Sequence, residues 1–234
     1  MDYDVYNREE RYLCSHLFRL LHEPTDGYYA LRTFVGDSGA PPSFRIFAEV
    51  ALIRDAYFIR CPDVRGFMDD LVRLIMRQES VQACRVYSEL PEDLQDYRKT
   101  HPKQIKWKAD SQLTAGEQVV YGAMQGMFNA KPDLVICLDN KMFVYEAKFT
   151  LGFDAEQIGR TRKIAEVWAK LLHNDLGFEN EPNVEMRTLG MSKYAPNISW
   201  EAISRIAEKV YPADDRTRVA LANAVRPSVD FLRA

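Results

Sequence analysis

Two short apolar segments separated by three polar residues constrain the fold of this chain more than any other feature. Residues 135–138 read VICL and residues 142–145 read MFVY, and both segments are rich in residues that favour β-strands. Asp139 and Asn140 lie between them, and both residue types are common in tight turns. The pattern therefore predicts a β-hairpin.

The turn of this hairpin decides which charged residues lie together. If residues 139 and 140 alone form the turn, Asp133 lies directly opposite Glu146, with their Cβ atoms about 5 Å apart. Lys148 follows Glu146 by two positions, so both side chains share one face of the strand. A slip of one residue in the register would separate the two acids.

Three charged groups at one end of a hairpin suit one kind of chemistry. Two neighbouring carboxylates raise each other's pKa unless a cation lies between them, and a hard divalent cation prefers oxygen ligands. The ammonium of Lys148 would stabilise a developing negative charge or orient a water molecule. The set predicts metal-assisted hydrolysis of a phosphodiester. The alternative is that these residues form an ordinary solvent-exposed strand end, because an aspartate before a strand and a Glu-x-Lys triplet are each common by themselves.

The remaining elements predict an α/β protein. Residues 7–22 have the spacing of an amphipathic helix, and helices are also expected over 43–59, 64–83 and 153–173 and from about residue 199. Residues 182–191 alternate as a strand does. From residue 115 onward the order is strand, strand, helix, strand, which predicts a mixed central sheet flanked by helices.

The change of character near residue 115 predicts two regions. Residues 1–114 are expected to form a helical region, and residues 115–234 the α/β core with C-terminal helices. The first helix belongs either to the helical region or to the core, and in the second case residues 24–114 are an insertion.

Pro132-Asp133 followed by Glu146-Ala147-Lys148 resembles the PD-(D/E)xK nuclease superfamily, whose fold is that of the restriction endonucleases. The resemblance covers residues 115–190 and extends to the first helix if that helix joins the core. It implies a core of helix, three strands, helix and strand, here with additional helical segments. It also implies that Asp133 and Glu146 bind Mg²⁺ or Mn²⁺ together with the backbone carbonyl of Ala147, and that Lys148 is catalytic.

Many members of that superfamily carry a further acid in the helix before the sheet, and two residues qualify here. Glu10 lies in the first predicted helix, where it also completes a capping box with Asn7. Glu117 is closer to the motif in sequence, where an ordinary surface acid is the alternative. Either residue is a candidate metal ligand.

The helix after the motif offers candidate contacts to nucleic acid. Some members carry a glutamine there, which Gln157 matches, although Asp154 and Gln157 also have the spacing of a capping box. Arg160 and Arg162 follow on the same helix and are candidate phosphate contacts. A solvated helix face explains the two arginines equally well.

A basic segment provides a second candidate contact to phosphate. Residues 98–108 carry five lysines and arginines and no acid, with Lys103 and Lys106 near the middle. Trp107 is available to stack on a base. A solvated basic loop is the alternative.

Composition limits the other functional classes. The net charge is −3, so the chain as a whole is not strongly basic. The first residues lack the pattern of a secretory signal and no apolar stretch is long enough to span a membrane, so we expect a cytoplasmic protein without membrane contact. The four cysteines are scattered without the spacing of a zinc site. No glycine-rich phosphate loop of the G-x-x-x-x-G-K type and no G-x-S-x-G motif occurs.

The sequence therefore predicts a metal-dependent nuclease that hydrolyses phosphodiester bonds, most simply an endonuclease acting on DNA, with RNA as an alternative substrate. The competing hypothesis is a catalytically silent module on the same fold that binds nucleic acid or a protein. A homodimer is compatible with the first hypothesis, because enzymes that cut both strands are often dimers.

Overall fold

The computed structural model describes residues 10–36, 43–60, 62–95, 113–149 and 152–225. The chain divides into two compact units. The first comprises Met1–Glu49, Pro132–Ile158 and Val184–Ala234, and the second comprises Val50–Lys131 and Gly159–Asn183. The units are thus not the two contiguous regions expected on either side of residue 114. Strand pairing accounts for the difference, because a strand near residue 45 joins the sheet formed by the hairpin.

The fold is α/β with a five-stranded mixed sheet in the order β1-β2-β3-β4-β5. β1 pairs antiparallel with β2, β2 pairs antiparallel with β3, and β4 pairs parallel with β5. The strands are β1 (Phe44–Ala48), β2 (Leu134–Leu138), β3 (Lys141–Ala147), β4 (Asn183–Gly190) and β5 (Ile198–Ser199).

The hairpin of β2 and β3 has the predicted register. Leu138 pairs with Lys141, and Leu134 pairs with Tyr145. Asp139 occupies the first position of the turn with a φ of 50°, a left-handed conformation that aspartate tolerates better than most residues. Asp133 directly precedes the paired residue Leu134, and its side chain accepts a hydrogen bond from the backbone nitrogen of Ala147, the residue after Glu146.

The helix expected over residues 43–59 is wrong in its first part. Phe44–Ala48 forms the edge strand β1, whose Ile46 pairs with Ile136 of β2. A five-residue apolar segment such as FRIFA fits either a helix or a strand, and here the distant partner strand decides between them. The chain becomes helical only at α3 (Leu52–Asp55) and the π-helical turn that follows it, Ala56–Arg60.

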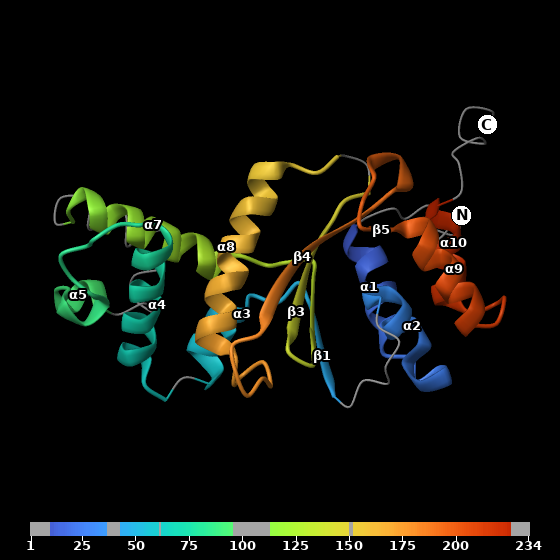
Figure 1. Cartoon of the computed structure of the whole chain (residues 1–234), viewed down its shortest axis with the longest axis horizontal. Coiled ribbons are helices and arrows are strands. Elements are labelled where there is room, and N and C mark those ends of the chain that lie inside the picture. The colour runs from blue at the N-terminus through green and yellow to red at the C-terminus, as the bar shows by residue number, and fades with distance from the viewer. Residues whose placement is uncertain (1–9, 37–42, 61, 96–112, 150–151, 226–234) are drawn as a thin grey trace. The chain divides into compact units, whose positions relative to one another are not determined.

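Four helices of the first unit cover one face of the sheet (Figure 1). They are α1 (Glu10–Leu21), α2 (Thr25–Val35), α9 (Trp200–Val210) and α10 (Arg216–Val225). Alternate residues of the hairpin pack under them, among them Ile136 and Tyr145. Because successive side chains of a strand point to opposite faces, Glu146 points to the other face of the sheet.

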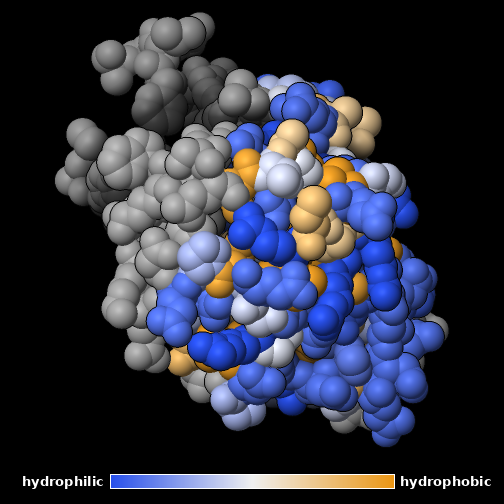
Figure 2. All heavy atoms as spheres, turned by 90° about the vertical axis from the view of Figure 1, so that its left-hand side faces the viewer, coloured by the Kyte–Doolittle hydropathy of each residue, from blue (hydrophilic) through white to orange (hydrophobic). Residues whose placement is uncertain are grey.

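Helices make up the described part of the second unit. α4 (Val64–Gln78) packs on α7 (Ala115–Asn129) and on the short 3-10 helix Tyr87–Glu89. The unit also contains α5 (Glu92–Gln95) and, from residue 159, the continuation of α8 (Ala155–Leu172). The described side chains seen in Figure 2 are mostly hydrophilic, with apolar ones scattered between them.

The strand at 182–191 and the helices at 64–83, at 153–173 and after residue 199 are all present, as β4, α4, α8 and α9. Ser199 caps α9 by accepting a hydrogen bond from the backbone nitrogen of Ala202. Among the described helices, none combines the length and the apolar character needed to cross a bilayer.

Candidate functional site

The hairpin brings Asp133, Glu146 and Lys148 together. Oδ2 of Asp133 accepts a hydrogen bond of 2.7 Å from the backbone nitrogen of Ala147, the residue between the other two. Nζ of Lys148 lies 3.0 Å from Oε1 of Glu146. These three residues, together with Glu10 and Gln157 described below, are called the acid–lysine cluster, and all five belong to the first unit.

Helix α1 contributes Glu10 to this cluster. Its Oε1 accepts a hydrogen bond of 2.8 Å from the backbone nitrogen of Phe149, which directly follows Lys148. Asn7, the other half of the predicted capping box, lies outside the described residues. The structure therefore gives the carboxylate of Glu10 a partner at the end of β3, far away in sequence.

The first turn of α8 contributes Gln157. Its amide nitrogen donates a hydrogen bond to Oε1 of Glu146, the same oxygen that Lys148 contacts. Asp154 caps the start of this helix by accepting a hydrogen bond from the backbone nitrogen of Glu156. The side chain of Gln157 is thus directed to the cluster, whereas the sequence suggested it as a contact to nucleic acid.

The carboxyl group of Asp133 has a raised pKa, chiefly because it is buried. Burial raises its pKa to about 6, because a charged group loses hydration in the protein. The hydrogen bond from Ala147 acts in the opposite direction, and the negative charge of Glu146 raises the pKa further. Asp133 is therefore mostly ionised at neutral pH, in surroundings that would favour a cation.

Lys148 is held in its charged form. Burial acts to lower its pKa, but the hydrogen bond and the negative charge of Glu146 outweigh burial and leave the pKa above its ordinary value. The side chain keeps 21% of its surface exposed. At neutral pH Lys148 is consequently an ammonium ion that a solvent-borne ligand can reach, suited to stabilising negative charge.

Gly190 borders the cluster through a close backbone contact. The backbone nitrogen of Lys148 donates a hydrogen bond of 2.8 Å to the carbonyl of Leu189. A Cβ atom at position 190 would lie 3.2 Å from the carbonyl oxygen of Lys148 and 3.0 Å from the ring of Phe153. The sequence prediction missed this residue, although a glycine inside a strand is itself a signal of a close approach.

Glu117 has a structural role in the second unit. The side chain is fully buried, and its Oε1 lies 2.8 Å from Nε of Arg85. It also forms a capping box with Thr114 at the start of α7. Glu117 is therefore neither an exposed surface acid nor a free carboxylate, and Glu10 is the upstream acid that contacts the strand end.

The predicted phosphate contacts are exposed or lie outside the described residues. Arg160 is exposed on α8, and Arg162 is paired with Glu166 at 3.4 Å on the same helix. Lys103 and Lys106 belong to the segment 96–112, which is outside the described residues. The position of Arg160 and Arg162 on the exposed face of α8 is sufficient to explain why these residues are charged, and no bound ligand is required.

The candidate oxygen donors for a metal ion lie at one end of the hairpin. Asp133, directly before β2, and Glu146 in β3 supply carboxylates, and Ala147, whose backbone nitrogen contacts Asp133, supplies a backbone carbonyl. Within the described ranges, no three or more side chains of His, Cys, Asp and Glu are grouped so that they could hold a metal ion. Any cation bound here would therefore keep water ligands.

Comparison of the chain with models of known protein families, with curated proteins and with solved structures gave no significant match. The resemblance to the PD-(D/E)xK superfamily therefore rests on the motif alone, and any function proposed for the chain rests on the geometry of the acid–lysine cluster.

Proposed function

We propose that the protein is a metal-dependent nuclease of the PD-(D/E)xK type that hydrolyses phosphodiester bonds, with DNA as its expected substrate. One observation carries the proposal. The carboxylate of Asp133 is bound to the peptide between Glu146 and Lys148, so two acids and a charged lysine meet at one strand end. A solvated strand end would leave these side chains independent of one another.

The donor set of the cluster fits Mg²⁺ or Mn²⁺. Mg²⁺ is commonly held by one or two carboxylates and retains several waters, which matches Asp133, Glu146 and the carbonyl of Ala147. A bound cation would lower the pKa of Asp133, which burial and the neighbouring acids Glu146 and Glu10 raise. When bound, such an ion would polarise the phosphodiester and activate a water molecule.

Lys148 supplies the positive charge that the reaction needs. Phosphodiester hydrolysis builds up negative charge on the phosphoryl oxygens, and a fixed cation lowers the barrier by stabilising that charge. Because the pKa of Lys148 is raised by Glu146, the side chain acts as an ammonium donor and not as a general base. Its contact with Glu146 also fixes where the ammonium lies.

Glu10 and Gln157 hold this arrangement in place. Glu10 fixes the peptide of Phe149 immediately after Lys148, and Gln157 fixes the carboxylate of Glu146. Both are positioning residues, because Glu10 acts on the backbone directly after Lys148 and Gln157 acts on Glu146, a proposed metal ligand. Substituting either residue should lower metal affinity or activity, as substituting the hydrogen-bond partners of metal ligands does.

A second candidate function rests on the same cluster. Oε1 of Glu146 is shared by Lys148 and Gln157, an arrangement in which the carboxylate is already neutralised by the protein. A catalytically silent module that binds nucleic acid or a protein would retain such a contact for stability. In that case the protein would neither bind divalent cations through Glu146 nor cleave any nucleic acid.

One incubation experiment tests the proposal. Purified protein is mixed with linear DNA, circular DNA and single-stranded RNA, each with Mg²⁺, with Mn²⁺ and with EDTA. Cleavage is expected with either cation and not with EDTA. Lys148→Ala is expected to abolish it, whereas Lys141→Ala, which removes the exposed lysine at the opposite end of β3, is expected to cleave normally. Equal cleavage by both variants would overturn the proposal.

A further inference from the structure

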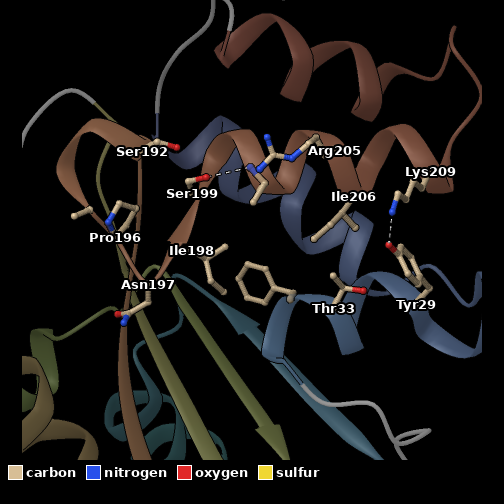
Figure 3. Close-up of a pocket in the computed structure, with 13 residues that line it drawn as sticks. Tyr29, Thr33, Ser192, Pro196, Asn197, Ile198, Ser199, Arg205, Ile206 and Lys209 are labelled. Carbon is tan, nitrogen blue, oxygen red and sulfur yellow. Dashed lines mark hydrogen bonds between the residues drawn. The ribbon is translucent and has the colours of Figure 1, made fainter.

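A cavity of about 570 Å³ lies in the first unit between α2, α9 and the connection from β4 to β5 (Figure 3). None of its lining residues belongs to the acid–lysine cluster. The volume is within the range of sites for small organic ligands. The residues on which the inference depends are Tyr29, Thr33, Phe34, Ile198, Arg205, Ile206 and Lys209.

Helix α9 presents one continuous stripe to this cavity. Ala202, Arg205, Ile206 and Lys209 all line it, and their spacing of three or four residues places them on one helix face. Ile206 is buried, whereas Arg205 and Lys209 are exposed. The stripe therefore combines an apolar floor with two cationic side chains at the rim.

Helix α2 supplies the opposite wall. Nζ of Lys209 lies 3.3 Å from the hydroxyl of Tyr29 and 5.7 Å from the centre of its ring. Figure 3 shows this contact at one end of the cavity, with Thr33 on the same helix. The hydrogen bonds from Lys209 and Thr33 hold the pKa of Tyr29 below its ordinary value, which makes its hydroxyl a better hydrogen-bond donor.

The lining of the cavity carries positive charge and no acid of its own. It contains Arg205 and Lys209 and no carboxylate, and the described residues include no acidic partner for Arg205 at ion-pair distance. The hydroxyl of Ser192 donates to Glu201, the side-chain oxygen of Asn197 accepts from Thr188, and Ser199 caps α9. The charged side chains of the lining are therefore cationic, and they favour an anion.

The floor of the cavity selects an anion that also has an apolar surface. Phe34, Ile198 and Ile206 line this floor. Ile198 is the most accessible of the three, since Phe34 and Ile206 keep only 2% and 7% of their surface exposed. A free inorganic phosphate would contact the cations alone. A flat ring bearing a phosphate would cover this floor and reach Arg205 and Lys209, whose side chains are the usual phosphate donors.

We infer that this cavity binds a nucleoside phosphate, with the base against Phe34, Ile198 and Ile206 and the phosphate against Arg205, Lys209 and Tyr29. The ligand is either a free nucleotide or the terminal nucleotide of a nucleic-acid strand, since both present the same group. The inference does not depend on cleavage by the acid–lysine cluster. If the ligand is the terminal nucleotide of a nucleic-acid strand, the cavity would bind nucleic acid at a site separate from the acid–lysine cluster.

Calorimetric titrations of the full chain test the inference. The probes are deoxyadenosine 5′-monophosphate, deoxyadenosine, and a short single-stranded oligodeoxyadenylate with and without a 5′-phosphate. All titrations are run in EDTA on the Lys148→Ala background, so that a failure of the proposed nuclease activity leaves them unaffected. The double variant Arg205→Ala/Lys209→Ala removes both cations of the cavity. Arg73→Ala, which removes an exposed arginine of α4, is the matched control.

The expected result is binding of the monophosphate at least about tenfold tighter than binding of deoxyadenosine, and a loss of about tenfold or more in the double variant but not in Arg73→Ala. Tighter binding of the 5′-phosphorylated oligonucleotide than of its 5′-hydroxyl form would assign the site to strand ends, and binding of the monophosphate alone would assign it to free nucleotides. Equal binding with and without phosphate, no binding, or unchanged binding in the double variant would overturn the inference.

Discussion

Oδ2 of Asp133 lies 2.7 Å from the backbone nitrogen of Ala147. An acid that precedes β2 is thereby attached to the last residue of β3, which lies between Glu146 and Lys148. The contact closes the open end of the hairpin and gives the carboxylate one defined position. A site that must hold a cation and a phosphoryl group at fixed distances requires such a defined position.

Glu10 is expected to act through the hydrogen bond that it accepts, and not through its charge. Glu10→Gln keeps an oxygen that can accept from the backbone nitrogen of Phe149, so it should cleave at nearly the normal rate. Glu10→Ala removes the acceptor and should lower the cleavage rate about tenfold or more. The measurement is the single-turnover rate in Mg²⁺. Equal losses in both variants would show that the charge of Glu10 is needed.

Gln157 is expected to set the position of the Glu146 carboxylate. Gln157→Ala removes the amide that donates to Oε1 of Glu146 and should raise the Mg²⁺ concentration required for half-maximal cleavage about tenfold. Glu156→Ala, a change at the exposed neighbour on α8, should leave that concentration unchanged. A normal Mg²⁺ requirement in Gln157→Ala would contradict this role.

Gly190 is expected to be required for the position of Lys148. In Gly190→Ala the new methyl group would press on the carbonyl of Lys148 and on the ring of Phe153. We expect a loss of about 1–3 kcal/mol in the free energy of unfolding and a cleavage rate reduced about tenfold or more. Gly159→Ala introduces the same methyl group on α8, where no atom lies within 4 Å, and should keep full stability and rate. Urea unfolding and single-turnover cleavage measure the two effects.

Glu117 is expected to make stability depend on pH. The hydrogen bond from Arg85 holds the pKa of this buried carboxyl below its ordinary value of 4.5. Its contribution to stability is therefore present above pH 4.5 and is lost as the pH falls through the lower, folded-state pKa. Glu117→Gln keeps a capping residue but loses the ion pair.

At neutral pH this substitution should lower Tm by about 2–4 °C, the shift that corresponds to about 1 kcal/mol in a chain of this size. The difference from the wild type should shrink as the pH is lowered below 4.5. Thermal unfolding followed by circular dichroism at several pH values gives both quantities. A difference in Tm that does not change with pH would exclude the ion pair as its cause.

The part of the site that could be predicted is the part that depends on local sequence. The alternation of VICL and MFVY and the Asp139-Asn140 turn fix the hairpin register within a single stretch of chain. The register in turn fixes which residues face each other, so the meeting of Asp133, Glu146 and Lys148 follows from it.

The part that could not be predicted depends on contacts between distant segments. Phe44–Ala48 is a strand only because β2 is available to pair with it. Glu10 and Glu117 are both acids near a predicted helix start, and only the folded chain shows that one contacts Phe149 and the other Arg85. Asp154 and Gln157 have capping-box spacing, yet the Gln157 amide binds Glu146.

The most direct test of the nuclease assignment is the rate at which Asp133→Asn cleaves circular DNA in Mg²⁺. Asp139→Asn is the matched control, because it removes the same charge at the exposed turn, at the other end of the same strand. We predict that Asp133→Asn loses about a hundredfold or more of the cleavage rate, and that Asp139→Asn stays close to the wild type. Cleavage by Asp133→Asn at the wild-type rate would contradict the proposed active site.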